Sequence, residues 1–177
     1  MTICGLLKLS ARQLARQPMQ VQQPLSPHIF TTGARWMATH LPPRAGQREG
    51  SERADFGQYG SLKYGSSLLA LVAVVVAGGW AKMPLLLVLP LAGIAFYVVE
   101  IHFLFLFPLL LDGVAHPLHT SIRATYRVGF FKALAWTLVL AAFMLAGLLD
   151  RRRPWRNWHI GCLALIYWYR DEVRAGI

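Results

Sequence analysis

The chain has 177 residues, of which 55% are hydrophobic and 15% charged, whereas ordinary soluble domains carry about 25% charged residues. Its formal net charge is +10, but no nucleic-acid motif and no basic stripe on an amphipathic domain accompanies that charge, which argues against nucleic acid as a partner. Cys4 and Cys162 are too few for a disulfide framework or a zinc site. The long apolar runs lie between residues 66 and 149, which favours an all-α integral membrane protein.

Residues 1–43 form a basic segment without acidic residues. A helix over residues 3–16 would be amphipathic, with Lys8, Arg12 and Arg16 on its basic face. Such a helix in an acid-poor segment is typical of an organellar transit peptide. We therefore expect an otherwise irregular tail that carries a mitochondrial address, with a plastid address or an uninformative disordered tail as the alternatives.

The first membrane span is expected after a polar linker. Residues 44–65 bear glycine and glutamate and are too few for a folded module of their own. Residues 66–83 would make about 27 Å of helix, just enough for a hydrocarbon core. Small residues recur along this run at a spacing that lets another helix approach closely. The predicted helix-packing residues are Ala73, Ala77, Gly78 and Ala81.

The second apolar run, residues 84–111, is longer than one straight span requires. As a continuous helix it would extend about 42 Å, so we expect it to tilt, kink or project from the bilayer. Pro90 and Pro108 offer kink sites near its two ends.

Glu100 and His102 are the intramembrane polar candidates in this run. A carboxylate deep in a bilayer costs a few kcal/mol. Glu100 is therefore expected to make an inter-helix hydrogen bond, to pair with a Lys or Arg, also one from another subunit, or to handle a proton or cation. His102 is two positions further on and cannot face Glu100 on a regular helix. We expect it to make a polar packing contact, because a haem would need a second histidine at matching depth.

The third span is expected over residues 129–149, about 31 Å of helix, with Lys132 close enough to one end to reach the interface. Residues 150–177 follow, rich in the Arg and Trp that mark a membrane–water boundary. The predicted lipid-headgroup residues are Arg151, Arg152, Arg153, Trp155, Arg156 and Trp158. Residues 160–168 are too few to cross as a helix. We expect an interfacial or half-inserted helix there, with a fourth, partly buried crossing as the alternative.

Three crossings fix which loops share a side. The N-terminal tail and residues 112–128 would lie on one side of the membrane, and residues 151–156 on the other. Because both sides are basic, the positive-inside rule favours neither orientation.

The sequence holds no Gly-rich phosphate loop, nucleophile elbow or zinc-protease motif, and we predict no catalytic residue, metal or haem. Bound phospholipids are expected. The favoured function is a non-catalytic accessory subunit of a large mitochondrial inner-membrane complex, such as a respiratory complex or the ATP synthase. Its partners would be other membrane subunits and anionic lipids. The alternatives are a small multi-pass carrier or channel that uses Glu100 and His102, and a membrane-embedded enzyme or assembly factor.

Overall fold

The structure is a computed structural model that describes residues 2–16, 29–42, 55–150 and 153–177. Throughout these ranges the regular structure is helical and no strand occurs. The α-helices are α1 (Ile3–Arg16), α2 (Ile29–His40), α3 (Phe56–Trp80), α4 (Leu85–Glu100), α5 (Leu106–Leu111), α6 (Pro117–Val128), α7 (Phe130–Leu148) and α8 (Arg156–Trp168). Three apolar helical stretches are long enough to cross a membrane, namely Phe56–Trp80, Leu85–Leu111 and Phe130–Leu148. The predicted all-α architecture with three apolar segments is confirmed.

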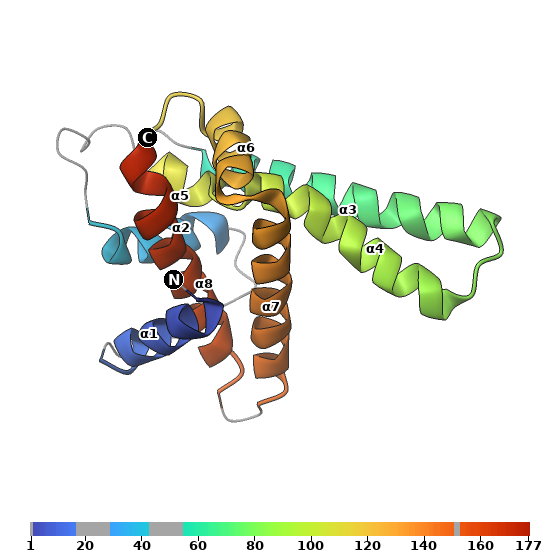
Figure 1. The fold of residues 1–177 in the computed structure, drawn as a ribbon, viewed down its shortest axis with the longest axis horizontal. Helices are drawn as coiled ribbons and strands as arrows, with labels where there is room; N and C mark the ends of the chain where they lie inside the picture. The colour runs from blue at the N-terminus through green and yellow to red at the C-terminus, as the bar shows by residue number, and fades with distance from the viewer. Residues whose placement is uncertain (1, 17–28, 43–54, 151–152) are drawn as a thin grey trace.

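A long helical hairpin projects from a body that the other helices form (Figure 1). Helices α3 and α4 run side by side away from the body and return to it, while α7 and α8 stand crosswise to them. Both termini lie in the body. The two parts differ in exposure, because the side chains that line the hairpin are mostly exposed and those at the centre of the body are buried.

The hairpin is closed by a tight turn and by close helix packing. Lys82 adopts a left-handed backbone conformation with φ of 52° in the turn, and Pro84 precedes the first residue of α4, a position where a missing N–H costs no helical hydrogen bond. Gly78 packs directly on α4, since a Cβ there would lie 2.6 Å from Cγ2 of Val88. Glycine is therefore what lets the two helices approach at this level.

The second apolar run is broken rather than continuous. Helix α4 ends at Glu100, a 3-10 turn (Ile101–Phe103) follows, and α5 begins at Leu106. Two carbonyl groups at the break accept hydrogen bonds from hydroxyls of α6: Thr125 donates to the Ile101 carbonyl at 2.7 Å, and Ser121 to the His102 carbonyl at 2.8 Å. The Ile101 carbonyl also accepts from the Leu104 amide at 3.2 Å. The break falls at neither Pro90 nor Pro108, the two expected kink sites, which lie within α4 and α5.

Helix α8 lies at the centre of the body. Leu163, Trp168, Tyr169 and Val173 are buried there, and α1, α2 and α7 pack around α8. The segment at residues 160–168 is thus helical, as expected, and it packs within the body; its interfacial or half-inserted position in a membrane stays a prediction. Its length was too short for a crossing, but its apolar residues are covered by neighbouring helices of the same chain.

The N-terminal region is more ordered than expected. The predicted helix over residues 3–16 is present as α1, which buries Leu6 and Leu14 against the core and leaves Lys8 and Arg12 exposed. The irregular tail is wrong for residues 29–40, which form α2.

The prediction of a polar linker is also wrong for residues 56–65, which belong to α3. Helix α3 begins at Phe56, and the Asp55 side chain caps it by accepting a hydrogen bond from the Gln58 amide at 3.0 Å. Residues 44–54 of the expected linker lie outside the described residues.

Candidate functional site

Glu100 forms an ion pair with Lys63 at the base of the hairpin. Lys63 lies two turns into α3 and Glu100 is the last residue of α4, so antiparallel packing brings them to the same level. Lys63 Nζ lies 3.1 Å from Glu100 Oε1, and the two side chains are only 6% and 14% exposed. Of the roles expected for Glu100, the structure shows pairing with a cation, and that cation is a lysine of the same chain.

The pair sits at the end of the apolar hairpin rather than halfway along it. Seventeen helical steps separate Lys63 from Trp80 at the tip, which corresponds to about 26 Å. Sequence reasoning placed Glu100 deep in a span because the apolar run continues to residue 111. The helix break after Glu100 shows that the run serves two purposes, since α4 lines the hairpin and α5 belongs to the core of the body.

Aromatic rings surround the lysine end of the pair. Lys63 Nζ lies 5.2 Å from the ring centre of Tyr64 and 5.7 Å from that of Phe107. A cation over ring faces is attracted by their quadrupoles, more strongly where water is excluded. Phe107 in turn stacks on Phe30 and Phe56, at ring-centre distances of 6.1 and 6.3 Å. The pair therefore links α3, α4, α5 and α2.

His102 lies in a different environment from Glu100. Its Nδ1 is 2.8 Å from the Val98 carbonyl oxygen, and its Nε2 is 3.2 Å from the Tyr126 hydroxyl. Its ring also packs near Phe130, at a centre distance of 6.2 Å. These contacts are those of a polar residue that joins the helix break to α6 and α7.

A second buried ion pair was missed by sequence reasoning. Asp112 follows α5 and is 2% exposed, and it receives two hydrogen bonds of 2.8 Å from Arg174 Nε and Nη2. Tyr169 also donates to Asp112 at 2.7 Å, and Arg174 donates to the Pro42 carbonyl at 2.7 Å. This group ties the end of α5 to the C-terminal segment and to the chain after α2. A lone acid after an apolar run was the only signal, and it does not reveal a partner so far along the chain.

Further polar contacts fasten the C-terminal segment to α6 and α7. Lys132 Nζ lies 2.7 Å from Glu172 Oε2, so this lysine pairs within the protein, whereas the sequence suggested that it reaches the membrane interface. Trp168 Nε1 donates to the same carboxylate at 3.2 Å. Arg127 donates to the carbonyls of Val173 and Gly176, both at 2.8 Å, and cations near the last carbonyls of a helix are favourable.

The predicted helix-packing residues separate into two groups. Gly78 packs on α4, but Ala73, Ala77 and Ala81 are exposed along the hairpin. The face that actually joins α3 to α4 therefore differs from the alanine stripe, which remains a predicted contact surface for another helix.

The predicted headgroup residues lie mainly at the connection between α7 and α8. Arg153, Arg156 and Trp158 are exposed, and Trp155 is partly buried against Trp158. Arg151 and Arg152 are outside the described residues. Lipid-headgroup binding by this segment stays a prediction.

Cys162 lies close enough to the first ion pair for Lys63 to act on its thiol. It is partly buried in α8, and burial raises the pKa of its thiol to about 11, although the nearby Lys63 acts in the opposite direction. A thiol with such a pKa is protonated at neutral pH and is a poor nucleophile or metal ligand. Among the described residues, no group of three or more His, Cys, Asp or Glu side chains is placed to hold a metal ion.

The arrangement thus consists of charged and polar side chains that hold helices to one another. No protein-family model matches the chain, and comparison with curated proteins and with solved structures gave no match either.

Proposed function

We propose that the chain is a non-catalytic structural subunit of a membrane complex. The observation that carries the proposal is the Lys63–Glu100 ion pair, which places the most prominent acid of the apolar region in a fixed contact between two helices. Asp112, which follows the second apolar segment, and Glu172 in the C-terminal segment are likewise paired with cations of the same chain. Breaking a buried pair is costly, so the Lys63–Glu100 and Asp112–Arg174 contacts serve to hold the fold together.

The hairpin supplies the surface through which such a subunit would contact its surroundings. Its outward side chains are apolar and exposed, and exposed apolar area of this extent indicates contact with lipid or with other membrane proteins. The exposed stripe of Ala73, Ala77 and Ala81 has the spacing that permits close approach of a second membrane helix. Other membrane subunits and phospholipids are therefore the proposed partners.

The proposed location is the mitochondrial inner membrane. It rests on the N-terminal segment, which lacks acidic residues up to Arg48, and on α1, whose exposed face carries Lys8 and Arg12. A cationic amphipathic helix of this kind is drawn toward a compartment that is negative inside. A respiratory complex or the ATP synthase is the proposed assembly.

Native electrophoresis tests this proposal. Mitochondria are solubilised mildly, the complexes are separated in a blue-native gel, and the chain is followed by mass spectrometry. We expect it to migrate with subunits of an energy-transducing complex, at a mass far above its own 19.8 kDa. Migration as a monomer or a small homo-oligomer would contradict the proposal and would favour a self-contained carrier, channel or enzyme.

A further inference from the structure

We propose that the α3–α4 hairpin crosses the bilayer and that α7 lies along the surface of the membrane, on the side of the body, instead of crossing it. The surface concerned is the whole hairpin together with the exposed side of α7, and its partner is the lipid bilayer. This inference rests only on the membrane part of the proposed function and is independent of which complex the chain joins.

The first support is that the hairpin is apolar on all sides beyond its base. Within it Gly78, Val88 and Ala92 are buried between the two helices. Large aliphatic side chains face outward, and they include Leu68, Leu69, Val72, Val75, Val76, Leu86, Leu87, Leu89, Leu91 and Ile94. A helix that is hydrophobic all round is found inside a large protein or inside a membrane.

The second support is the position of the polar groups at the two ends of the hairpin. The tip carries Trp80, which is 87% exposed, and the exposed Lys82. The base carries the Lys63–Glu100 pair. Trp and Lys are typical of the membrane–water interface. The length between base and tip, about 26 Å, is close to that of a hydrocarbon core of about 30 Å, and a small mismatch is accommodated by local thinning.

The third support is the direction of α7. Figure 1 shows α7 crosswise to the hairpin, so the two cannot both stand upright in one bilayer. If α7 crossed, the hairpin would lie within the bilayer plane, and Lys82 at its tip would have to be placed in lipid, which is unfavourable for a charged side chain. With the hairpin upright, α7 lies flat where the hairpin leaves the body.

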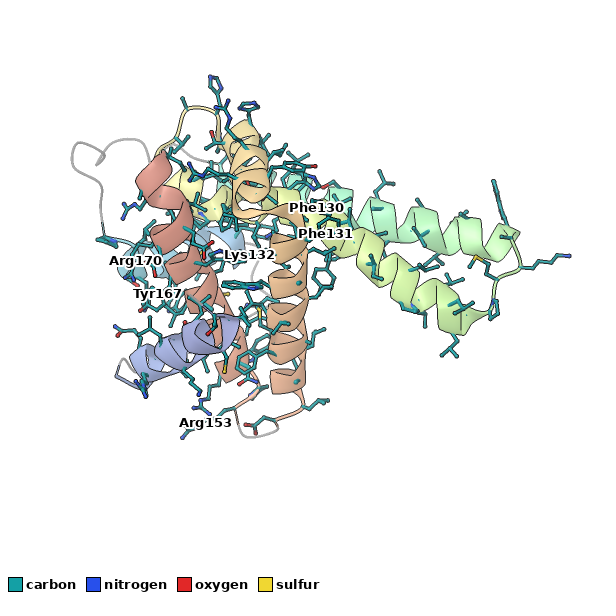
Figure 2. The ribbon with its side chains drawn as sticks, in the orientation of Figure 1. Phe130, Phe131, Lys132, Arg153, Tyr167 and Arg170 are labelled. Carbon is teal, nitrogen blue, oxygen red and sulfur yellow. The ribbon has the colours of Figure 1, made fainter. Side chains whose placement is uncertain are left out.

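The exposed side of α7 is suited to that position. Ala133, Thr137 and Leu140 are buried against the body, whereas Phe131, Val139, Leu145 and Leu149 are exposed. At helical spacing the exposed set lies opposite the buried one. Figure 2 shows Phe131 on the side of α7 nearer the hairpin and Lys132 on the side of α8. The apolar side of α7 thus faces the same membrane that the hairpin would enter.

Charge on the body is distributed consistently with this orientation. Arg170, which is exposed, lies beside Tyr167 on the side of the body away from the hairpin (Figure 2). Between Lys63 and Glu100, Lys82 at the tip of the hairpin is the one charged side chain. The membrane would therefore meet apolar side chains on the hairpin and α7, and water would meet the opposite side.

Single-cysteine labelling separates this topology from three crossings. In the full chain, with Cys4 and Cys162 replaced by serine, Lys82→Cys, His119→Cys and Arg153→Cys are introduced one at a time, because all three positions are exposed. Sealed vesicles of one orientation are treated with a membrane-impermeant maleimide, with and without detergent. The side labelled at His119→Cys is the reference.

We expect Arg153→Cys to be labelled from the same side as His119→Cys, and Lys82→Cys from the opposite side. If Arg153→Cys is labelled from the side of Lys82→Cys, then α7 crosses and the inference is wrong. If all three are labelled from one side, the hairpin does not cross, and the inference is wrong as well.

A depth measurement checks α7 without relying on sidedness. Val72 and Val139 are matched, because they lie near the middle of α3 and α7 and are 50% and 45% exposed. A spin label is attached at Val72→Cys or Val139→Cys in vesicles, and its collision rates with oxygen and with a water-soluble nickel complex are compared. We expect the label at Val72→Cys to be deep and that at Val139→Cys to be shallow. Equal depth at the two positions would overturn the inference, while the native mass of the assembly would be unaffected by either result.

Discussion

Replacing Lys63 by methionine would leave Glu100 at the base of the hairpin without the cation that it contacts at 3.1 Å. The pair is largely shielded from water, and removing one partner of a buried ion pair costs about 3–5 kcal/mol, because a charge is left uncompensated. We expect a loss in this range for Lys63→Met. Glu100→Gln should lose somewhat less, because the amide can still accept a hydrogen bond from Lys63.

The double variant is the informative one. Lys63→Met with Glu100→Leu replaces both charges by apolar side chains of similar length, and such replacements of buried pairs are often neutral or stabilising. We therefore expect the double variant to be more stable than Lys63→Met alone by at least about 2 kcal/mol, so the two substitutions should be strongly non-additive.

Unfolding of the purified chain by SDS in mixed micelles, followed by helical circular dichroism, measures these differences. Lys82→Met is the matched control, because it removes an exposed cation from the same hairpin and should change stability by less than about 0.5 kcal/mol. Additive effects of the two base substitutions would refute the reasoning, as would a Lys63→Met variant no less stable than the control.

Three smaller predictions use the same unfolding assay or a simple labelling assay. Thr125→Val removes a hydroxyl that donates to the buried Ile101 carbonyl at the helix break. Because that carbonyl keeps the Leu104 amide as a donor, the substitution should cost about 0.5–1.5 kcal/mol. Thr137→Val should cost nothing, because the Thr137 hydroxyl is buried without a hydrogen bond among the described residues. Gly78→Ala would place a methyl group 2.6 Å from an α4 side chain and should cost about 1–3 kcal/mol, whereas Gly79→Ala, with open space around it, should be neutral or stabilise by about 0.5–1 kcal/mol. The Cys162 thiol should react slowly with iodoacetamide at neutral pH and faster as the pH approaches 11. Because folding favours the neutral thiol, the contribution of this thiol to stability is complete below pH 9 and is lost as the pH rises toward 11. Fast alkylation of Cys162 at pH 7 would contradict these expectations. Equal losses of stability for Thr125→Val and Thr137→Val, or for Gly78→Ala and Gly79→Ala, would contradict them as well.

The three apolar helical segments could be predicted because long apolar runs need no knowledge of tertiary contacts. The amphipathic helix at residues 3–16 was also predictable, since its period is visible in the sequence. The start of α3 was not, because Lys63 reads as the end of a polar linker until its partner on α4 is known. The packing of α8 within the body was not predicted for a related reason, since an apolar run too short for a membrane can equally be buried in a helical core.

The candidate site was predicted only in part. Glu100 stood out as an acid in an apolar run, and pairing was one of its expected roles, but the sequence could not name Lys63 as the partner. The Asp112–Arg174 pair joins residues far apart in the chain, and nothing local in the sequence links them. Long-range pairings of this kind depend on how the helices pack, so they emerge only from the fold.

The most direct test of a structural rather than a catalytic or transport role is turnover per assembled complex in cells that express Glu100→Gln. The amount of the assembled complex is measured on native gels, and its turnover or ion flux is divided by that amount. We predict that less complex assembles and that each assembled complex works at the normal rate, because Glu100 holds helices together. Normal assembly with a reduced rate per complex would contradict the account and would place Glu100 on a proton or ion path.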